Sequence, residues 1–178
     1  FANLNLDLDT LHETASGGSD TLDFSAFVTS VTFDMSLAEN TFSGLTIRLQ
    51  NVNGVDTPTG YENLTGGSHD DVLTGNDLAN EIRGNDGNDT VVAGRGNDIL
   101  VIGNGTNDIA GGVGNDTYVF SDPGSVSTTT LREDAGTIGG GALSPGGRDT
   151  IDLTAVTTPV TFSLTVAVNL LTDHTVNL

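Results

Sequence analysis

The sequence contains no cysteine, lysine or tryptophan among its 178 residues. Without cysteine, disulfide bonds are excluded as a source of stability. Without lysine, Schiff-base catalysis and phosphate binding by a Walker-type lysine are excluded as well. Aromatic residues make up only 5% of the chain, so large side chains are too scarce to fill a large compact core. These absences favour small stacked strands joined by tight turns.

Positive charge is also scarce, because five arginines stand against 24 acidic residues and the formal net charge is −19. Nucleic acid and anionic membrane surfaces are therefore unlikely partners, since both are bound through basic residues. No apolar run approaches the roughly 18 residues of a membrane span, and no signal peptide opens the chain. The first residue is Phe1, and we expect the chain to be a piece of a longer protein.

Glycine and aspartate are abundant, with 24 glycines and 19 aspartates. Glycine favours turns, and aspartate favours turns and hard cations over helices. An acidic excess of this size is typical of a disordered tail, a halophilic surface or a cation-binding protein. Only the placement of the aspartates along the chain separates these three readings.

The acidic residues follow a regular period in the middle of the chain. Six nine-residue units run without a gap from residue 66 to residue 119: GGSHDDVLT, GNDLANEIR, GNDGNDTVV, AGRGNDILV, IGNGTNDIA and GGVGNDTYV. Position six holds Asp71, Asn80, Asp89, Asp98, Asn107 and Asp116, and position eight holds Leu73, Ile82, Val91, Leu100, Ile109 and Tyr118. The preceding nonapeptide keeps the period loosely, with Glu62 at position six. A disordered acidic tail has no reason to keep such a period.

Each unit has the residues of a turn followed by a short strand. Glycines at positions one, two and four allow positive φ, so that backbone carbonyls can point at one spot. Position six adds a carboxylate, and the position-eight side chain of the strand points inward. Two units would form one coil of about 18 residues, because a strand and a turn on each side close the coil. Residues 18 apart therefore face each other in successive coils.

This stacking predicts pairs of carboxylates that repel one another unless a cation lies between them. The repulsion could reach several kcal/mol per pair at an intermediate dielectric, and Ca²⁺ cancels it with six to eight oxygen ligands at roughly 2.3–2.6 Å. The best candidate sites pair Asp71 with Asp89 and Asp98 with Asp116, whereas pairs that use Asn80 or Asn107 should bind weakly or not at all. A β-helix that stacks glycine turns and asparagine ladders without metal remains the alternative.

A second, longer repeat relates the two ends of the chain. DTLDFSAFVTSVTFDMSLAEN, from Asp20, aligns with DTIDLTAVTTPVTFSLTVAVN, from Asp149, at an offset of 129 residues. Both copies alternate apolar and polar residues, as expected of half-buried strands. The flank aspartates Asp20, Asp23, Asp149 and Asp152 are expected to be exposed turn or strand-end residues, with calcium binding as the alternative.

These patterns predict an elongated all-β protein, since no stretch has a helical period with caps. We expect three parts: an N-terminal strand-rich flank at residues 1–56, a parallel β-roll at 57–120, and a C-terminal flank at 121–178 that begins the next copy of the module. Neighbouring repeats of the same longer chain would then be natural partners of this segment.

The array matches G-G-x-G-x-D-x-U-x and resembles the RTX, or haemolysin-type, calcium-binding β-roll. The segments GGSDTLDFS, ENLTGGSHDDVLTGN, GNDTYVF and DTIDL resemble the C-terminal domain of serralysin-type secreted metalloproteases and the repeat blocks of large RTX surface proteins. The resemblance implies several bound Ca²⁺ ions, export by a type I system and folding outside the calcium-poor cytosol. It also implies that the position-six side chains and turn carbonyls, such as those of Gly84, Gly87, Gly94 and Gly96, are the ligands.

No catalytic motif emerges from the sequence. His12 and Glu13 begin an H-E pair, but Ser16 stands where a zinc protease needs its second histidine. We therefore expect no enzyme, but a calcium-binding structural module of a secreted or cell-surface protein such as an adhesin. The alternatives are a ligand-binding module for polysaccharide or ice built on the same roll, and the accessory C-terminal domain of a secreted enzyme.

Overall fold

The computed structural model describes residues 8–12, 18–50, 60–121, 128–132, 147–157 and 175–177. Within these residues the secondary structure consists of β-strands without any helix, and most neighbouring strands are parallel. No helix in this described part is long and apolar enough to cross a membrane. The expected all-β class and parallel roll are confirmed. Residues 158–169 of the second copy of the long repeat, for which half-buried strands are predicted, lie outside the described residues.

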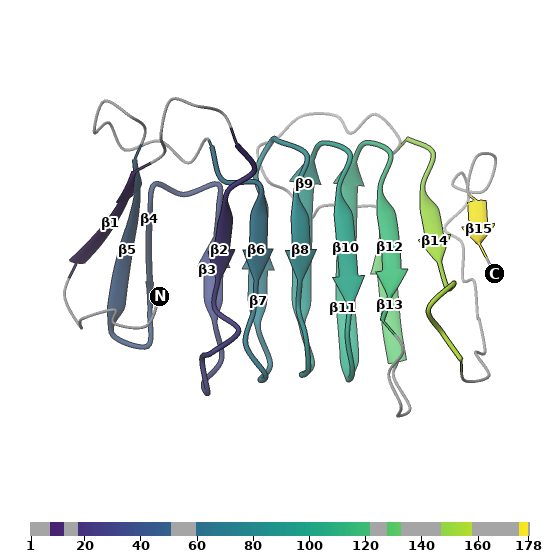
Figure 1. Cartoon of the computed structure of the whole chain (residues 1–178), viewed down its shortest axis with the longest axis horizontal. Coiled ribbons are helices and arrows are strands. Elements are labelled where there is room, and N and C mark those ends of the chain that lie inside the picture. The colour runs from purple at the N-terminus through teal and green to yellow at the C-terminus, as the bar shows by residue number, and fades with distance from the viewer. Residues whose placement is uncertain are drawn as a thin grey trace.

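Two parallel sheets form the roll, and the chain alternates between them as it winds (Figure 1). The first, here called sheet one, contains β2 (Thr21–Asp23), β6 (Asn63–Thr65), β8 (Glu81–Arg83), β10 (Ile99–Ile102), β12 (Thr117–Phe120), β14 (Thr150–Asp152) and β15 (Thr175–Asn177). The second, sheet two, contains β3 (Thr32–Asp34), β7 (Val72–Thr74), β9 (Thr90–Arg95), β11 (Thr106–Val113) and β13 (Thr128–Arg132).

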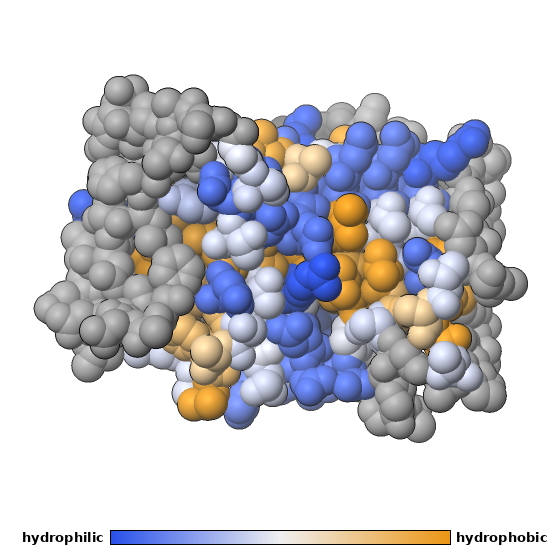
Figure 2. Space-filling model, in the orientation of Figure 1, coloured by the Kyte–Doolittle hydropathy of each residue, from blue (hydrophilic) through white to orange (hydrophobic). Residues whose placement is uncertain are grey.

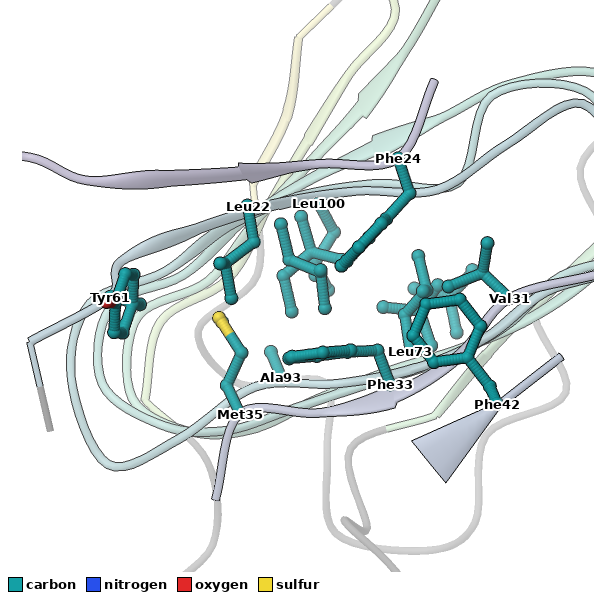
Figure 3. Packing of buried hydrophobic residues seen from close by; sticks show 14 of the residues in the cluster. Leu22, Phe24, Val31, Phe33, Met35, Phe42, Tyr61, Leu73, Ala93 and Leu100 are labelled. Atoms are coloured by element: carbon teal, nitrogen blue, oxygen red, sulfur yellow. The ribbon is translucent and has the colours of Figure 1, made fainter. Parts of the chain in front are cut away.

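The position-eight residues form the core between the sheets. In sheet one, Leu100 lies beside Ile82 and Tyr118, so that residues 18 apart are neighbours as predicted. Each short strand buries its middle side chain and turns the two flanking ones outward. Figure 3 shows these side chains meeting in the middle of the roll. Those at most 2% exposed are Leu22, Phe33, Leu64, Leu73, Ile82, Val91, Leu100, Ile109 and Tyr118.

A small third sheet covers the N-terminal end of this core. It consists of β1 (Leu8–His12), parallel to β5 (Leu45–Gln50), and β4 (Glu39–Phe42), antiparallel to β5. The β4–β5 hairpin turns at Ser43 and Gly44, whose φ angles of 48° and 81° suit a two-residue turn. Its Phe42 packs with Phe24 at a ring distance of 5.4 Å, so the hairpin joins the core of the roll.

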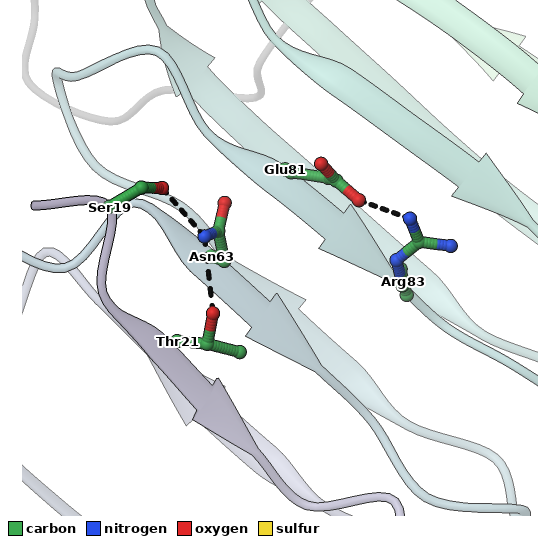
Figure 4. A network of polar contacts seen from close by, with 5 residues as sticks. All are labelled: Ser19, Thr21, Asn63, Glu81 and Arg83. Atoms are coloured by element: carbon green, nitrogen blue, oxygen red, sulfur yellow. Dashed lines mark hydrogen bonds and ion pairs between the residues drawn. The ribbon is translucent and has the colours of Figure 1, made fainter.

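Strands of both flanks extend the stack of the array. Leu22 of β2 pairs with Leu64 of β6, although 42 residues separate them, and Ile151 of β14 pairs with Tyr118 of β12. On the outer face of sheet one, Asn63 Nδ2 donates to Ser19 Oγ at 2.8 Å (Figure 4). The division of the chain at residues 56 and 120 stays a prediction.

The outer surface agrees with the high net charge. The face drawn in Figure 2 carries mainly hydrophilic residues, interspersed with smaller apolar patches. On the outer side of sheet one, Arg83 forms an ion pair with Glu81 (Figure 4). Exposed ion pairs of this kind contribute little stability, so the roll depends on its interior.

Candidate metal centre

The position-six side chains lie inside the roll, where the turns lead into the strands, and Asn107 is already the second residue of β11. They form two rows, one before each sheet, and all but Glu62 are at most 2% exposed. The sheet-one row is Glu62, Asn80, Asp98 and Asp116, and the sheet-two row is Asp71, Asp89 and Asn107. The structure thus brings together the pairs that the 18-residue spacing predicts.

Each row is held by hydrogen bonds between successive coils. The N–H of Asp71 donates to Oδ1 of Asp89 at 3.0 Å, and the N–H of Asp89 donates to Oδ1 of Asn107 at 2.9 Å. In the other row the N–H of Asn80 donates to Asp98 Oδ1 at 2.7 Å. One oxygen of Asp89, Asp98, Asn107 and Asp116 therefore ties its coil to the preceding one, and this oxygen can belong to aspartate or asparagine. Asn80 differs, because its Oδ1 accepts the N–H of Asn76 in its own turn at 2.9 Å.

A second ladder at position five runs in the opposite direction. The N–H of Asn88 donates to Oδ1 of Asp70, and the N–H of Thr106 donates to Oδ1 of Asn88, both at 2.8 Å. Asn115 and Asn97 repeat the contact on the other side of the roll. These side chains are exposed. Sequence reasoning missed this ladder, although the recurrence of Asp and Asn at position five is the signal that could have revealed it.

Glycines let oxygen atoms crowd into the turns. A Cβ on Gly84 would overlap Oδ2 of Asp89, so this unit needs glycine at position one for the carboxylate to fit. Gly96 has a φ of 128°, and a Cβ there would overlap the carbonyl oxygen of Leu78 in the preceding coil. Of the other predicted carbonyl ligands, Gly87 and Gly94 also have positive φ, 130° and 112°.

The buried carboxylates are electrostatically strained without a counterion. Burial raises the pKa of Asp89 and of Asp98 to about 7 and that of Asp116 to about 6. Burial also raises the pKa of Asp71. Smaller contributions come from the next carboxylate in the row: Asp71 acts on Asp89, and Asp116 acts on Asp98. A bound cation would remove both costs.

Two buried carboxylate oxygens show where a cation would bind. Oδ2 of Asp98 and Oδ2 of Asp116 are buried and have no hydrogen-bond partner. Burying a charged oxygen without a partner is costly, and Ca²⁺ prefers such oxygens as ligands. The residues therefore fit a hard cation. In the described part of the chain, no three Asp, Glu, His or Cys side chains converge on one point, so neutral oxygens such as backbone carbonyls, side-chain amides or water would have to supply the remaining ligands.

Glu62 differs from the other members of its row. Its side chain is half-buried, and Oε2 accepts a hydrogen bond from the N–H of Asp20 at 2.9 Å. The longer glutamate thus makes the same bond to the preceding coil that aspartate and asparagine make elsewhere. It connects the array to the N-terminal flank.

One prediction for the flank aspartates is wrong. Asp149 was expected to be exposed, but only 3% of it is accessible, and its Oδ1 accepts the N–H of Asp116 at 2.8 Å. Its burial follows from β14 pairing with β12, which places the turn before β14 over the turn before β12. By contrast, Asp23 is exposed as expected, with Oδ1 accepting the N–H of Ser25.

Comparison with known families agrees with this geometry. The profile of the RTX calcium-binding nonapeptide repeat matches residues 65–100 in four copies. A search of curated proteins gives no match. The profile match lies within the array, so the likeness of the flanks to serralysin-type proteases stays an expectation. Residues 65–100 of this chain therefore match the RTX calcium-binding nonapeptide repeat, wound here into a parallel β-roll.

Proposed function

We propose that the chain is a calcium-binding structural module, without catalytic activity, of a secreted or cell-surface protein. Ca²⁺ would bind between successive coils and would be required for the roll to fold outside the cell. The observation that carries this proposal is the stacking of buried carboxylates in successive coils, with Oδ2 of both Asp98 and Asp116 lacking a partner. A purely scaffolding role of the turns gives no reason to bury these charges.

The proposed ligand set follows from the two rows. Asp71 with Asp89, and Asp98 with Asp116, would supply the charged oxygens, while turn carbonyls such as those of Gly84, Gly87, Gly94 and Gly96 would complete the shell. When bound, Ca²⁺ supplies the positive charge that the rows lack and six to eight coordination positions. Asn80, Asn107 and Glu62 keep the coils in register, and we expect them to contribute weaker ligands.

Folding and binding would then be coupled. In the unfolded chain the carboxylates lie apart and in water, whereas in the roll they lie together and buried. The free energy of binding is therefore available to the folding of the module. Extracellular calcium modules typically bind with dissociation constants of about 10⁻⁴–10⁻³ M, which keeps them empty at cytosolic calcium levels.

The test is a calcium titration of the purified chain after exhaustive chelation, followed by far-ultraviolet circular dichroism. We expect little β signal without calcium and a cooperative gain with a midpoint of about 10⁻⁴–10⁻³ M. Mg²⁺ at equal concentration is the control and should not give the gain, because it demands a smaller octahedral shell. An unchanged β signal in chelator would refute calcium-dependent folding. A midpoint below about 10⁻⁶ M would refute the idea that folding is confined to the outside of the cell, because the roll would then bind calcium at much lower concentrations than extracellular modules do.

A further inference from the structure

The chain leaves the regular array after β12 and returns to sheet one at β14. Thr117 of β12 pairs with Thr150 of β14, so 33 residues separate neighbours that are 18 apart within the array. The parallel pairing is otherwise the same as between β10 and β12. The turn that leads into β14 therefore lies one coil beyond the turn that contains Asp116.

Asp149 occupies the position-six place in this additional turn. It directly precedes β14 as Asp116 directly precedes β12. Its Oδ1 accepts the N–H of Asp116 at 2.8 Å, just as Asp116 Oδ1 accepts the N–H of Asp98 at 2.9 Å. The sheet-one row is thus continued by a third successive buried aspartate.

The additional turn also has a glycine, Gly147, in the place that Gly114 takes one coil earlier. The N–H of Gly147 donates to the carbonyl oxygen of Gly114 at 2.8 Å, and a Cβ on Gly147 would overlap that oxygen. Gly96 and Gly114 stand in the same relation one coil earlier, since a Cβ on Gly114 would overlap the carbonyl oxygen of Gly96. The backbone of the additional turn therefore approaches its neighbour as the array turns do.

An unpartnered oxygen points to a ligand between these two coils. Asp116 is 1% exposed, and its Oδ2 has no hydrogen-bond partner. It lies against Gly111, where a side chain would overlap it, so it points into the turn. A buried carboxylate oxygen in this situation needs a cation or a donor. Oδ2 of Asp98, one coil before, is in the same situation.

We propose that Asp116 and Asp149 hold a further calcium ion, in a site formed between the last repeat and the C-terminal flank. This inference rests on the proposed function. The site lies outside residues 65–100, which match the repeat family, and it uses an aspartate that the nine-residue period does not reach. The three aspartates Asp98, Asp116 and Asp149 then hold two ions in one row.

The sheet-two row does not continue in this way. There Asn107 pairs with Thr129 of β13, so the next position in the row carries a hydroxyl instead of a carboxylate. Two neutral side chains do not create the repulsion that favours a divalent cation. The additional ion is therefore expected on the sheet-one side alone.

The test counts calcium ions per chain by equilibrium dialysis with radioactive calcium, on the whole chain. The decisive variant is Asp149→Asn, because Asn107 already accepts the N–H of Asp89 at 2.9 Å and shows that asparagine preserves the ladder. We expect one ion fewer per chain, with the circular dichroism spectrum in saturating calcium unchanged. Asp152→Asn is the matched control: this aspartate follows the turn and accepts hydrogen bonds from Thr154, so the ion count should stay at the wild-type value.

A second variant keeps the inference testable if Asp149→Asn does not fold. Asp116 lies between Asp98 and Asp149, so Asp116→Asn should remove two ions, whereas the array alone predicts the loss of one. Loss of only one ion in Asp116→Asn, or an unchanged count in folded Asp149→Asn, overturns the additional site. If the wild-type chain itself binds no calcium, the proposed function fails and the inference fails with it. The two failures are distinguishable, because the additional site can fail in the variants while the wild-type chain still binds calcium.

Discussion

The backbone N–H of Asp98 donates a 2.9 Å hydrogen bond to Oδ1 of Asp116, the residue one coil further along the roll. The other oxygen of Asp116 is buried without a partner. In the proposed site one carboxylate thus has two separate tasks, since one oxygen joins the coils and the other would bind the cation. Asparagine can perform the first task but supplies no charge for the second, as the ladder contact of Asn107 with Asp89 illustrates.

The variant Asp89→Asn should separate these two tasks in the sheet-two row. The ladder acceptor is retained, but the pair with Asp71 loses one charge, and we expect the calcium midpoint for folding to rise by about tenfold or more, roughly 1.4 kcal/mol. The midpoint is measured by circular dichroism. Asp86→Asn, an exposed position in the same unit, is the control and should shift the midpoint by much less. Equal shifts in both variants would show that general charge, and not the buried pair, controls binding.

The calcium-free protein should be more stable in acid than at neutral pH. In the folded state the pKa values of Asp89 and Asp98 lie at about 7 and that of Asp116 at about 6, above the ordinary value of 3.8. The folded state therefore binds more protons than the unfolded state between about pH 4 and pH 7, and stability falls as pH rises through this window.

Far-ultraviolet circular dichroism in chelator at pH 5 and pH 8 measures this dependence. We expect more β signal at pH 5, and Asp98→Asn should weaken the difference because it removes one titrating group. In saturating calcium, where the roll is folded, the urea midpoint should instead be higher at pH 8, since protons compete with the cation for the same oxygens. More β signal at pH 8 than at pH 5 in chelator would contradict the buried, raised-pKa state of these aspartates.

Substituting a turn glycine should destabilise the calcium-loaded roll. In Gly96→Ala the new Cβ would overlap the carbonyl oxygen of Leu78, and the φ of 128° is unfavourable for alanine. We expect a loss of about 2–4 kcal/mol in the free energy of unfolding, measured by urea denaturation in calcium. Gly18→Ala is the matched control, because nothing lies within 4 Å of its Cβ position. A neutral Gly96→Ala would mean that the turns do not stack as closely as described.

Removing the hydroxyl of Tyr118 should weaken the contact between the two sheets. The hydroxyl accepts the N–H of Gly111 at 3.0 Å and donates to the carbonyl oxygen of Arg132 at 3.3 Å, and the side chain is 1% exposed. Tyr118→Phe leaves these groups without that partner, which typically costs about 1–3 kcal/mol of unfolding free energy. The exposed Ile99→Val is the control, expected within about 0.5 kcal/mol of wild type by the same thermal or urea measurement. A loss in Ile99→Val equal to that in Tyr118→Phe would contradict the buried contact.

The sequence by itself determined the coil of the roll, because its information is local and periodic. Position eight of each unit is apolar and position six carries an oxygen, so the core residue Leu100 and the paired residues Asp71 and Asp89 follow from counting. The same pattern predicts the class of ligand, since stacked carboxylates repel one another and a hard cation would cancel that repulsion.

Only the tertiary structure decided what lies beyond the period. Asp149 joins the row of Asp116 across 33 residues, and β2 joins β6 across 42, because strand pairing, and not spacing, sets which segments become neighbours. Likewise, the division of Asp98 and Asp116 into a ladder oxygen and an unpartnered oxygen depends on where the preceding coil presents its N–H. Contacts between coils join residues far apart in the sequence. Counting repeats therefore predicts the contacts within the array, but not which flanking segments continue the stack beyond it.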